Sequence, residues 1–302
     1  MEEKLPALRI VDAHHHLWDL NRLNYPWLHT RPVGPTICGD ITPITDNFTV
    51  DRYIAGFGHH NVVKSVHVEA GANADSAVEE TEWLQQVAEE HGYPHAIVAK
   101  VDMHKPDAQA VIERHVAYKN VRGLRHMINW HTDMSKVYAP ENYLENETWL
   151  KNFALLGRYG LSFDLQIYAG QMGQLYELAK KHPEIPVAID HSGMPIDRSL
   201  EQLKLWKSGL RQLASLDHVH IKMSGLGMVD HRWTVESIRP YILTMIDIFG
   251  PDRAMFGSNF PVDKLYSSFE VLYDAYDSVT QDFADGERQK MFAETAEKFY
   301  RI

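Results

Sequence analysis

Residues 9–16 read RIVDAHHH, a short apolar run that ends in three histidines. Seven further stretches follow the same plan, in which β-branched and other apolar residues lead into a polar side chain. They span 62–69, 96–103, 121–128, 162–168, 186–191, 219–224 and 254–259. Runs of this length and composition are typical of buried β-strands.

Apolar positions at helical spacing fill the segments between these strands. The expected helices span 76–91, 106–117, 148–159, 171–181, 200–215, 235–249 and 287–300. Strands that alternate with helices indicate an α/β protein with a parallel sheet and crossover helices. Eight strand candidates favour closure into a (β/α)8 TIM barrel, one domain over 1–302, with a distorted barrel of seven strands as the alternative. We expect the Pro- and aromatic-rich stretch 18–49 to form a long loop over the mouth.

The composition excludes several classes of partner and location. The net charge is −11 and no run of Lys or Arg stands out, which argues against nucleic acid and against an anionic membrane surface. The single cysteine, Cys38, cannot form an internal disulfide, so a reducing compartment is expected. No stretch approaches the length of a membrane span or the apolar core of a signal peptide. These features predict a cytoplasmic protein that acts on a small molecule, and self-association is left open.

Two histidines at the end of the first strand are the first candidate site residues. Residues i and i+2 of a strand face the same side, so His14 and His16 should point together into the barrel and His15 away from it. Two imidazoles on one face can share a metal ion or a substrate oxygen. The plain alternative is a His-rich strand end without a role.

Polar residues also end the other strands, where a barrel places its active site. His191 follows the sixth strand and could act as an acid, a base or a metal ligand. Arg125 is the first choice for a substrate carboxylate or oxyanion, because its planar fork suits bidentate contacts. Lys222 is as compatible with an internal ion pair as with a substrate contact. The remaining rim candidates are Glu69, His126, Gln166 and Asn259, with Trp18, Trp27 and Trp130 as possible walls of a pocket for a ring substrate.

Several of these segments, taken together, resemble a known family. They read VDAHHHLWD with YPWL downstream, VRGLRHMINW, YGLSFDLQIY, AIDHSGMP, IKMSGL and MFGSNFPVD, and they run in order from residue 9 to residue 263. The chain resembles the "amidohydrolase 2" branch of the amidohydrolase superfamily, which includes sugar lactonases and 2-pyrone-4,6-dicarboxylate lactonase. The resemblance implies hydrolysis of a cyclic ester by water, without a covalent intermediate. It also matches His14, His16 and His191 to the histidines of the family site.

One position departs from the family pattern. The eighth strand of the family usually carries an Asp that serves as general base and metal ligand, and this chain has Asn259 there. An amide is no base near neutral pH and a poorer ligand than a carboxylate, so a site of His14, His16, Gln166 and Asn259 would bind a cation weakly. One divalent ion, zinc or manganese, and a metal-independent site therefore both stay open.

If Asn259 is no base, another group must take the proton from water. The candidates are His191, His126, Glu69 and Asp263, and His191 is favoured because an ordinary imidazole titrates near neutral pH. Asp190 precedes it, but successive strand residues point to opposite faces, so Asp190 need not orient that ring.

Three hypotheses for function follow. The first is a lactone hydrolase that acts on a small, polar, acidic or neutral cyclic ester. The second is a metal-dependent, non-oxidative decarboxylase, which predicts a tightly bound divalent ion. The third is a degenerate barrel with a binding role, and Asn259 is the residue that favours it.

Overall fold

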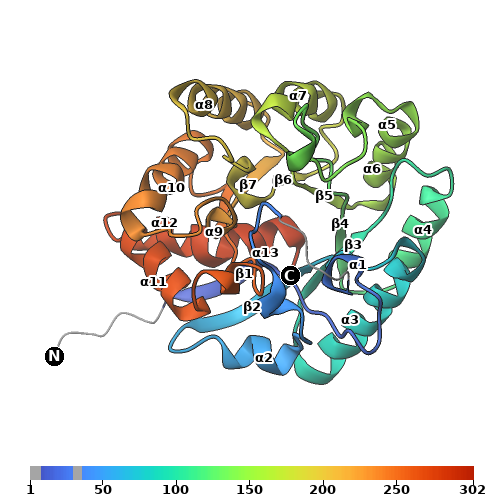
Figure 1. Ribbon diagram of the computed structural model, residues 1–302, viewed down its shortest axis with the longest axis horizontal. Coiled ribbons are helices and arrows are strands. Elements are labelled where there is room, and N and C mark those ends of the chain that lie inside the picture. Colours follow the sequence, from blue (N-terminus) through green and yellow to red (C-terminus); the bar gives the residue numbers. More distant parts are fainter. Residues whose placement is uncertain (1–7, 30–35) are drawn as a thin grey trace.

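The structure, a computed structural model, describes residues 8–29 and 36–302 and contains one sheet of eight parallel strands. The strands lie in the order of the sequence, each hydrogen-bonded to the next, and the helices surround them (Figure 1). This arrangement confirms the predicted (β/α)8 barrel and its count of eight strands. The strands are β1 (Arg9–His15), β2 (Asn61–Val68), β3 (Ala96–Lys100), β4 (Val121–Arg125), β5 (Ser162–Leu165), β6 (Val187–Ile189), β7 (Val219–Met223) and β8 (Ala254–Phe256).

The barrel closes between its first and last strands just beyond the end of β8. The Asn259 N–H donates to the His14 carbonyl at 2.7 Å, and the His16 N–H donates to the Phe260 carbonyl at 2.7 Å. A parallel bridge joins His15 and Phe260. The backbone of three expected site residues therefore forms the seam of the barrel.

Most expected helices are present, with shifted ends. They are α3 (Ala77–His91), α4 (Ala108–His115), α7 (Met172–Lys181), α8 (Leu200–Ala214) and α10 (Val235–Phe249). The expected helix over 148–159 is instead two short ones, α5 (Glu147–Phe153) and α6 (Leu155–Tyr159). The final helix over 287–300 is divided into α12 (Asp285–Gln289), a π-helical turn (Lys290–Glu294) and α13 (Thr295–Tyr300). Four α-helices of the described residues were not predicted, namely α1 (Pro26–His29), α2 (Val50–Ala55), α9 (Leu226–Val229) and α11 (Phe269–Thr280).

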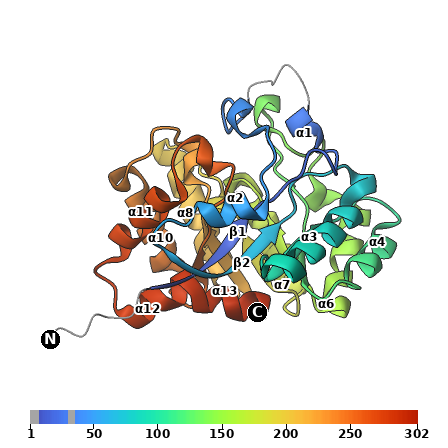
Figure 2. The same ribbon diagram turned by 90° about the horizontal axis from the view of Figure 1, so that it is seen from below.

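Two apolar layers hold these elements together. The larger one lies between the strands and the surrounding helices. The smaller one fills the barrel interior and joins inward residues such as Val11, Val66 and Met255 to Phe299 and Tyr300 of α13. Figure 2 shows α12 and α13 at the end of the barrel opposite α1 (Pro26–His29). Because α13 covers the N-terminal ends of the strands, access to the interior is left at the other end.

The long segment after β1 lies over that open end, as expected, although residues 30–35 are outside the described part. Backbone hydrogen bonds of 3.0 Å join Trp18 and Phe48 in both directions. The Trp27 indole N–H donates to the Ala70 carbonyl at 2.8 Å, which ties α1 to the loop after β2. Within residues 8–29 and 36–302, no helix combines the length and the apolar character needed to cross a membrane.

Candidate active site

A cavity of about 370 Å³ opens at the C-terminal ends of the strands. Its polar lining includes five of the expected residues, and most of its wall is apolar. These five expected residues are His16, Arg125, Gln166, His191 and Asn259. The wall includes Trp27, Ile41, Met127, Met228 and Val262. A concave, largely apolar site with a few convergent polar groups is typical of a small-molecule pocket.

Local backbone geometry directs two of these side chains. His191 (φ 52°) and Asn259 (φ 55°) both adopt the left-handed conformation, which costs a non-glycine residue about 1–3 kcal/mol. Gly225, with φ 67°, lies against the His191 ring, and a Cβ at this position would be 2.7 Å from Nδ1 of His191. Glycine is therefore required at 225 for His191 to keep its place. Strain of this kind, in two neighbouring lining residues, is typical of a functional site.

His16 presents a free lone pair toward the cavity. Its Nδ1 is 2.7 Å from the Val68 carbonyl, an acceptor, so Nδ1 carries the proton and donates it there. The neutral ring then leaves Nε2 as an acceptor. It lies 3.4 Å from Oδ1 of Asn259, which is also an acceptor, so these two atoms form no hydrogen bond in this tautomer. Burial, with the nearby Arg125 charge, lowers the pKa of His16 to about 3, so the ring is neutral at physiological pH.

His14 lies beside both cavity histidines. Its ring centroid is 5.0 Å from that of His16 and 4.4 Å from that of His191. His15 points away and stacks on Tyr53 with a centroid separation of 4.0 Å. The alternation expected at the end of β1 is thus observed.

A buried charge cluster lies around His14, with Lys222 at its centre. The ammonium of Lys222 is 2.5 Å from Oδ2 of Asp164 and 3.1 Å from Oδ1 of Asp190, and all three side chains are fully buried. The Tyr300 hydroxyl donates to Asp164 at 2.6 Å. Lys222 therefore forms internal ion pairs, which the sequence had left open beside a substrate contact.

Asp190 contacts His14 and not the histidine that follows it. Its Oδ1 is 3.3 Å from Nδ1 of His14. Despite burial, the ammonium of Lys222 and the neighbouring His14 hold the pKa of Asp190 well below its usual range. Burial and Lys222 hold the pKa of His14 far below its usual value, so a carboxylate lies beside a neutral ring.

Arg125 lines the cavity, but its charge is already balanced. Its Nε donates to Oε1 of Glu69 at 2.8 Å, and its Nη2 donates to the Glu69 carbonyl at 2.7 Å. Its Nη1 lies 3.8 Å from Oδ2 of Asp190. Glu69 is thus a partner of Arg125 and not part of the cavity wall, which removes it as a candidate base in contact with substrate.

His126 also lies away from the cavity lining. Its Nδ1 accepts a hydrogen bond from the Trp149 indole at 3.0 Å, and its ring lies 4.7 Å from that of Tyr143. The Arg125 side chain faces the barrel interior, and the next residue faces the surrounding helices. His126 therefore does not line the cavity, and a catalytic role for it stays a prediction.

Three other expected residues do not line the cavity. Trp18 is fully buried and donates to the Asp46 carbonyl at 2.8 Å, so it packs the long loop down. Trp130 follows β4 on the outer side, where its backbone N–H donates to Gln171 at 3.1 Å. Asp263 is buried behind Asn259, and the Asn259 amide and the Gly225 N–H both lower the pKa of its carboxyl group against the effect of burial. Of the three expected tryptophans, only Trp27 forms part of the wall.

Some lining residues escaped the sequence analysis. Lys100 is the last residue of β3 and lines the cavity, and the rule that flagged Arg125 at the end of β4 would have found it. Met127 and Tyr138 come from loops, Met228 comes from α9, and nothing in their local sequence marks them. Asp164 lies within β5, where a charged residue in a buried strand was a signal for an internal partner.

A divalent ion fits one group of side chains next to the cavity. Ligating atoms of His14, Asp190 and His191 lie within 4.8 Å of one another. Nε2 of His14 is buried without a hydrogen-bond partner, as a lone pair reserved for a metal would be. This group differs from the expected pair of His14 and His16. Lys222, which contacts both Asp190 and His14, is the competing cation.

Residues 11–302 match the sequence profile of the family described as amidohydrolase. The chain belongs to the amidohydrolase family. This membership gives the reaction class, so the protein is a hydrolase. Among curated proteins, the uncharacterized protein y4mH of Sinorhizobium fredii is 41% identical over 296 residues, which cover 98% of this chain and 99% of the relative.

The chain is also similar to proteins named as sugar lactonases and to solved structures of amidohydrolases. An L-fucono-1,5-lactonase of Burkholderia multivorans is 26% identical over 314 residues, which cover 98% of this chain and 97% of the relative. A solved amidohydrolase of the same species, with bound zinc, matches with a TM-score of 0.80 at 23% identity over 97% of this chain and 99% of that one. A probable 2-pyrone-4,6-dicarboxylic acid hydrolase of Acinetobacter baumannii has a TM-score of 0.71 at 14% identity, with 97% and 99% coverage. These two structures support the fold.

Proposed function

We propose that this amidohydrolase opens a small, uncharged lactone with water at the C-terminal mouth of the barrel. The observation that carries the proposal is the cavity of about 370 Å³, where neutral imidazoles and two amides meet a largely apolar wall. The similarity to L-fucono-1,5-lactonases supports the same substrate class.

His191 is the group proposed to take the proton from water. Its Nδ1 is 3.2 Å from the Ser224 hydroxyl, which leaves Nε2 available on the cavity side. Burial and the charges of Arg125 and Lys222 lower its pKa to about 3, while Asp190 opposes them, so the ring enters the reaction neutral. Water oxygen bonds to the lactone carbonyl carbon as its proton moves to His191. The ring C–O bond then breaks, and the same proton passes to the leaving alkoxide to give a hydroxy acid.

The amides and Arg125 can stabilise the oxyanion that forms on the carbonyl oxygen. Gln166 and Asn259 each carry an N–H₂ group in the cavity lining, and the Asn259 amide also faces the carboxyl group of Asp263. Donors held in place before the reaction are worth several kcal/mol at such a charge. On this proposal Asn259 is an oxyanion donor, a role that an Asp could not fill.

A substrate carboxylate would have to compete for Arg125, because Glu69 and Asp190 already flank its guanidinium. Lys100 also lines the cavity, and its ammonium donates to the Ala72 carbonyl at 2.6 Å. The apolar wall offers contacts to carbon atoms of the substrate. Of the acidic and neutral lactones that the sequence left open, we therefore propose the neutral one.

His14, Asp190 and His191 would hold a divalent ion, if one is used. When bound, such an ion supplies Lewis-acid polarisation of a carbonyl or a more acidic water. Asp190 carries the negative charge that such a site needs, and it shares that charge with Lys222.

The test compares hydrolysis of neutral and acidic lactones by the wild type, by His191→Gln and by the surface control His91→Gln. We expect turnover of a neutral lactone, a fall in kcat of at least about 100-fold in His191→Gln, and no change in the control. Equal kcat in wild type and His191→Gln would contradict the base assignment. Turnover of acidic lactones alone, or of no lactone, would contradict the proposed substrate class. Release of carbon dioxide from an aromatic acid would favour a decarboxylase.

A further inference from the structure

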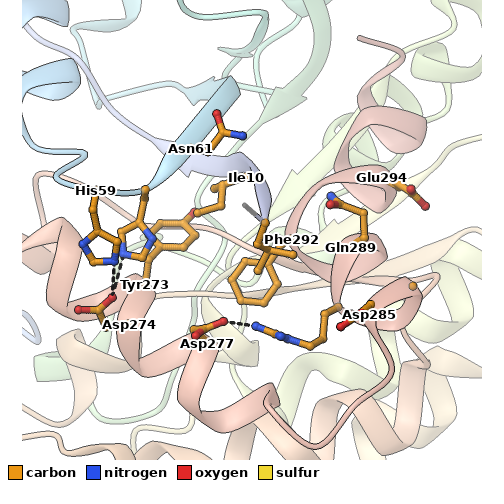
Figure 3. A pocket seen from close by; sticks show the side chains of 14 residues that line it. Ile10, His59, Asn61, Tyr273, Asp274, Asp277, Asp285, Gln289, Phe292 and Glu294 are labelled. Atoms are coloured by element: carbon orange, nitrogen blue, oxygen red, sulfur yellow. Dashed lines mark hydrogen bonds and ion pairs between the residues drawn. The ribbon is translucent and has the colours of Figure 1, made fainter. Parts of the chain in front are cut away.

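The opposite end of the barrel carries a second group of possible metal ligands. His59 and His60 precede β2, at the N-terminal ends of the strands, and Asp274 lies in α11. Nε2 of His59 and Nε2 of His60 are each 3.2 Å from the same oxygen, Oδ1 of Asp274. Figure 3 shows His59 and Asp274 facing one another at one edge of a cavity of about 590 Å³.

The spacing of these three atoms suits a tetrahedral ion. Zinc binds imidazole nitrogen and carboxylate oxygen at about 2.0–2.2 Å, which places neighbouring ligand atoms about 3.3 Å apart. The two observed nitrogen-to-oxygen distances are 3.2 Å. Three protein ligands leave the fourth position for water from the adjoining cavity.

A fourth residue fixes the ring of His59 in the form that can ligate. Nδ1 of His59 is 2.7 Å from Oε1 of Glu270, so Nδ1 carries the proton and Nε2 is left for a metal. A carboxylate behind a ligating histidine is a recurrent feature of zinc sites. Gly58 makes this contact possible, because a Cβ there would lie 2.6 Å from the carboxyl carbon of Glu270.

A proton could take the place of the metal. Glu270 raises the pKa of His59, and a protonated His59 would satisfy both Glu270 and Asp274 without an ion. That state gives His59 two acceptors, and Nε2 of His60 can donate to the Glu270 carbonyl, which lies 3.2 Å away, as does Oδ1 of Asp274. A metal would take Nε2 of His60 from that carbonyl and join all three side chains.

We propose that His59, His60 and Asp274 form a transition-metal site for zinc or cobalt at the N-terminal end of the barrel, with Glu270 as the residue that positions His59. The site is separate from the group near the active-site cavity, because it lies at the other ends of the strands. A bound ion would join the turn before β2 to α11.

The probe is zinc chloride, titrated by calorimetry into metal-depleted protein near pH 7.5, with cobalt absorption as a second readout. His59 is 63% exposed at its side chain, so His59→Ala should fold normally. His182→Ala is the control, because His182 pairs with Glu184 at 3.2 Å and no third ligand joins them among the described residues. The wild type and the control should bind one zinc ion more than His59→Ala does.

The positioning role is tested by Glu270→Gln, which should weaken binding at this site by about 10–100-fold without removing it. The absorption of tetrahedral cobalt should be lower in His59→Ala and in Asp274→Asn than in the wild type, by the contribution of one bound ion. Equal zinc stoichiometry in wild type and His59→Ala would overturn the proposal. Lactone hydrolysis should be the same in wild type and His59→Ala, so failure of the proposed function would not affect this test.

Discussion

The buried carboxyl group of Asp263 should make the stability of this protein fall as the pH rises. Burial raises its pKa from 3.8 to about 7, although the Asn259 amide and the Gly225 N–H oppose the effect. Between these two values the folded state holds a proton that the unfolded state has released. The folded state then binds more protons, so the free energy of unfolding decreases with pH through this window and levels off above about pH 7.

The magnitude follows from the width of the window. Each pH unit between 3.8 and about 7 is worth about 1.4 kcal/mol, which gives about 4 kcal/mol in total. About 3 kcal/mol of this falls between pH 5 and pH 8. Asp263→Asn keeps the shape of the side chain and cannot ionise. The variant should therefore gain about 3 kcal/mol of stability relative to the wild type when the pH rises from 5 to 8.

Urea unfolding of both proteins at several pH values between 5 and 8 measures this change, and any constant offset of the substitution cancels in the comparison. Asp282→Asn, at an exposed position after α11, supplies the control. Parallel stability profiles for wild type and Asp263→Asn would refute the reasoning, because they would show that burial does not raise the pKa of Asp263. Activity measured on the same samples reports whether Asp263 also matters for turnover.

Two further substitutions test the surroundings of His14 and His16. Asn259→Asp places a second carboxylate beside Asp263 and removes an oxyanion donor, so we expect at least about a 100-fold loss in kcat with retained folding. An increase in activity would instead show that the position serves as a base. Lys222→Met leaves Asp164 and Asp190 buried without their cation, so urea unfolding should show a loss of about 3–5 kcal/mol. Zinc should bind this variant more tightly than wild type, and unchanged stability and zinc affinity would contradict the central role of Lys222.

The order of strands and helices was readable from the sequence because buried parallel strands leave an apolar signature. Strand starts were accurate, as at Ala96 and Ser162, but the strands end earlier than predicted. The apolar residues beyond Lys100 and Leu165 are buried in loops at the mouth, and burial alone does not distinguish a strand from a loop. The helix α11 was missed although its buried residues recur every three to four positions.

Site residues could be predicted where they lie at the end of a strand, because a barrel places its active site there. They could not be predicted where their role depends on contacts across the barrel. His16, His191 and Asn259 were found because they lie within three residues of the end of a strand. His126 was expected in the site and does not line the cavity, because one step along the chain turns a side chain to the opposite face. The partners of Lys222 lie in β5 and directly after β6, and no local pattern reports such a contact.

The seam between β1 and β8 has a consequence for how the protein is made. Its two hydrogen bonds join backbone groups of His14 and His16 to groups of Asn259 and Phe260, which a ribosome adds only after seven further strands. Until then β1 presents an unpaired edge that can recruit other chains. Because His16 and Asn259 also line the proposed catalytic cavity, turnover should first appear during refolding or translation when the barrel closes.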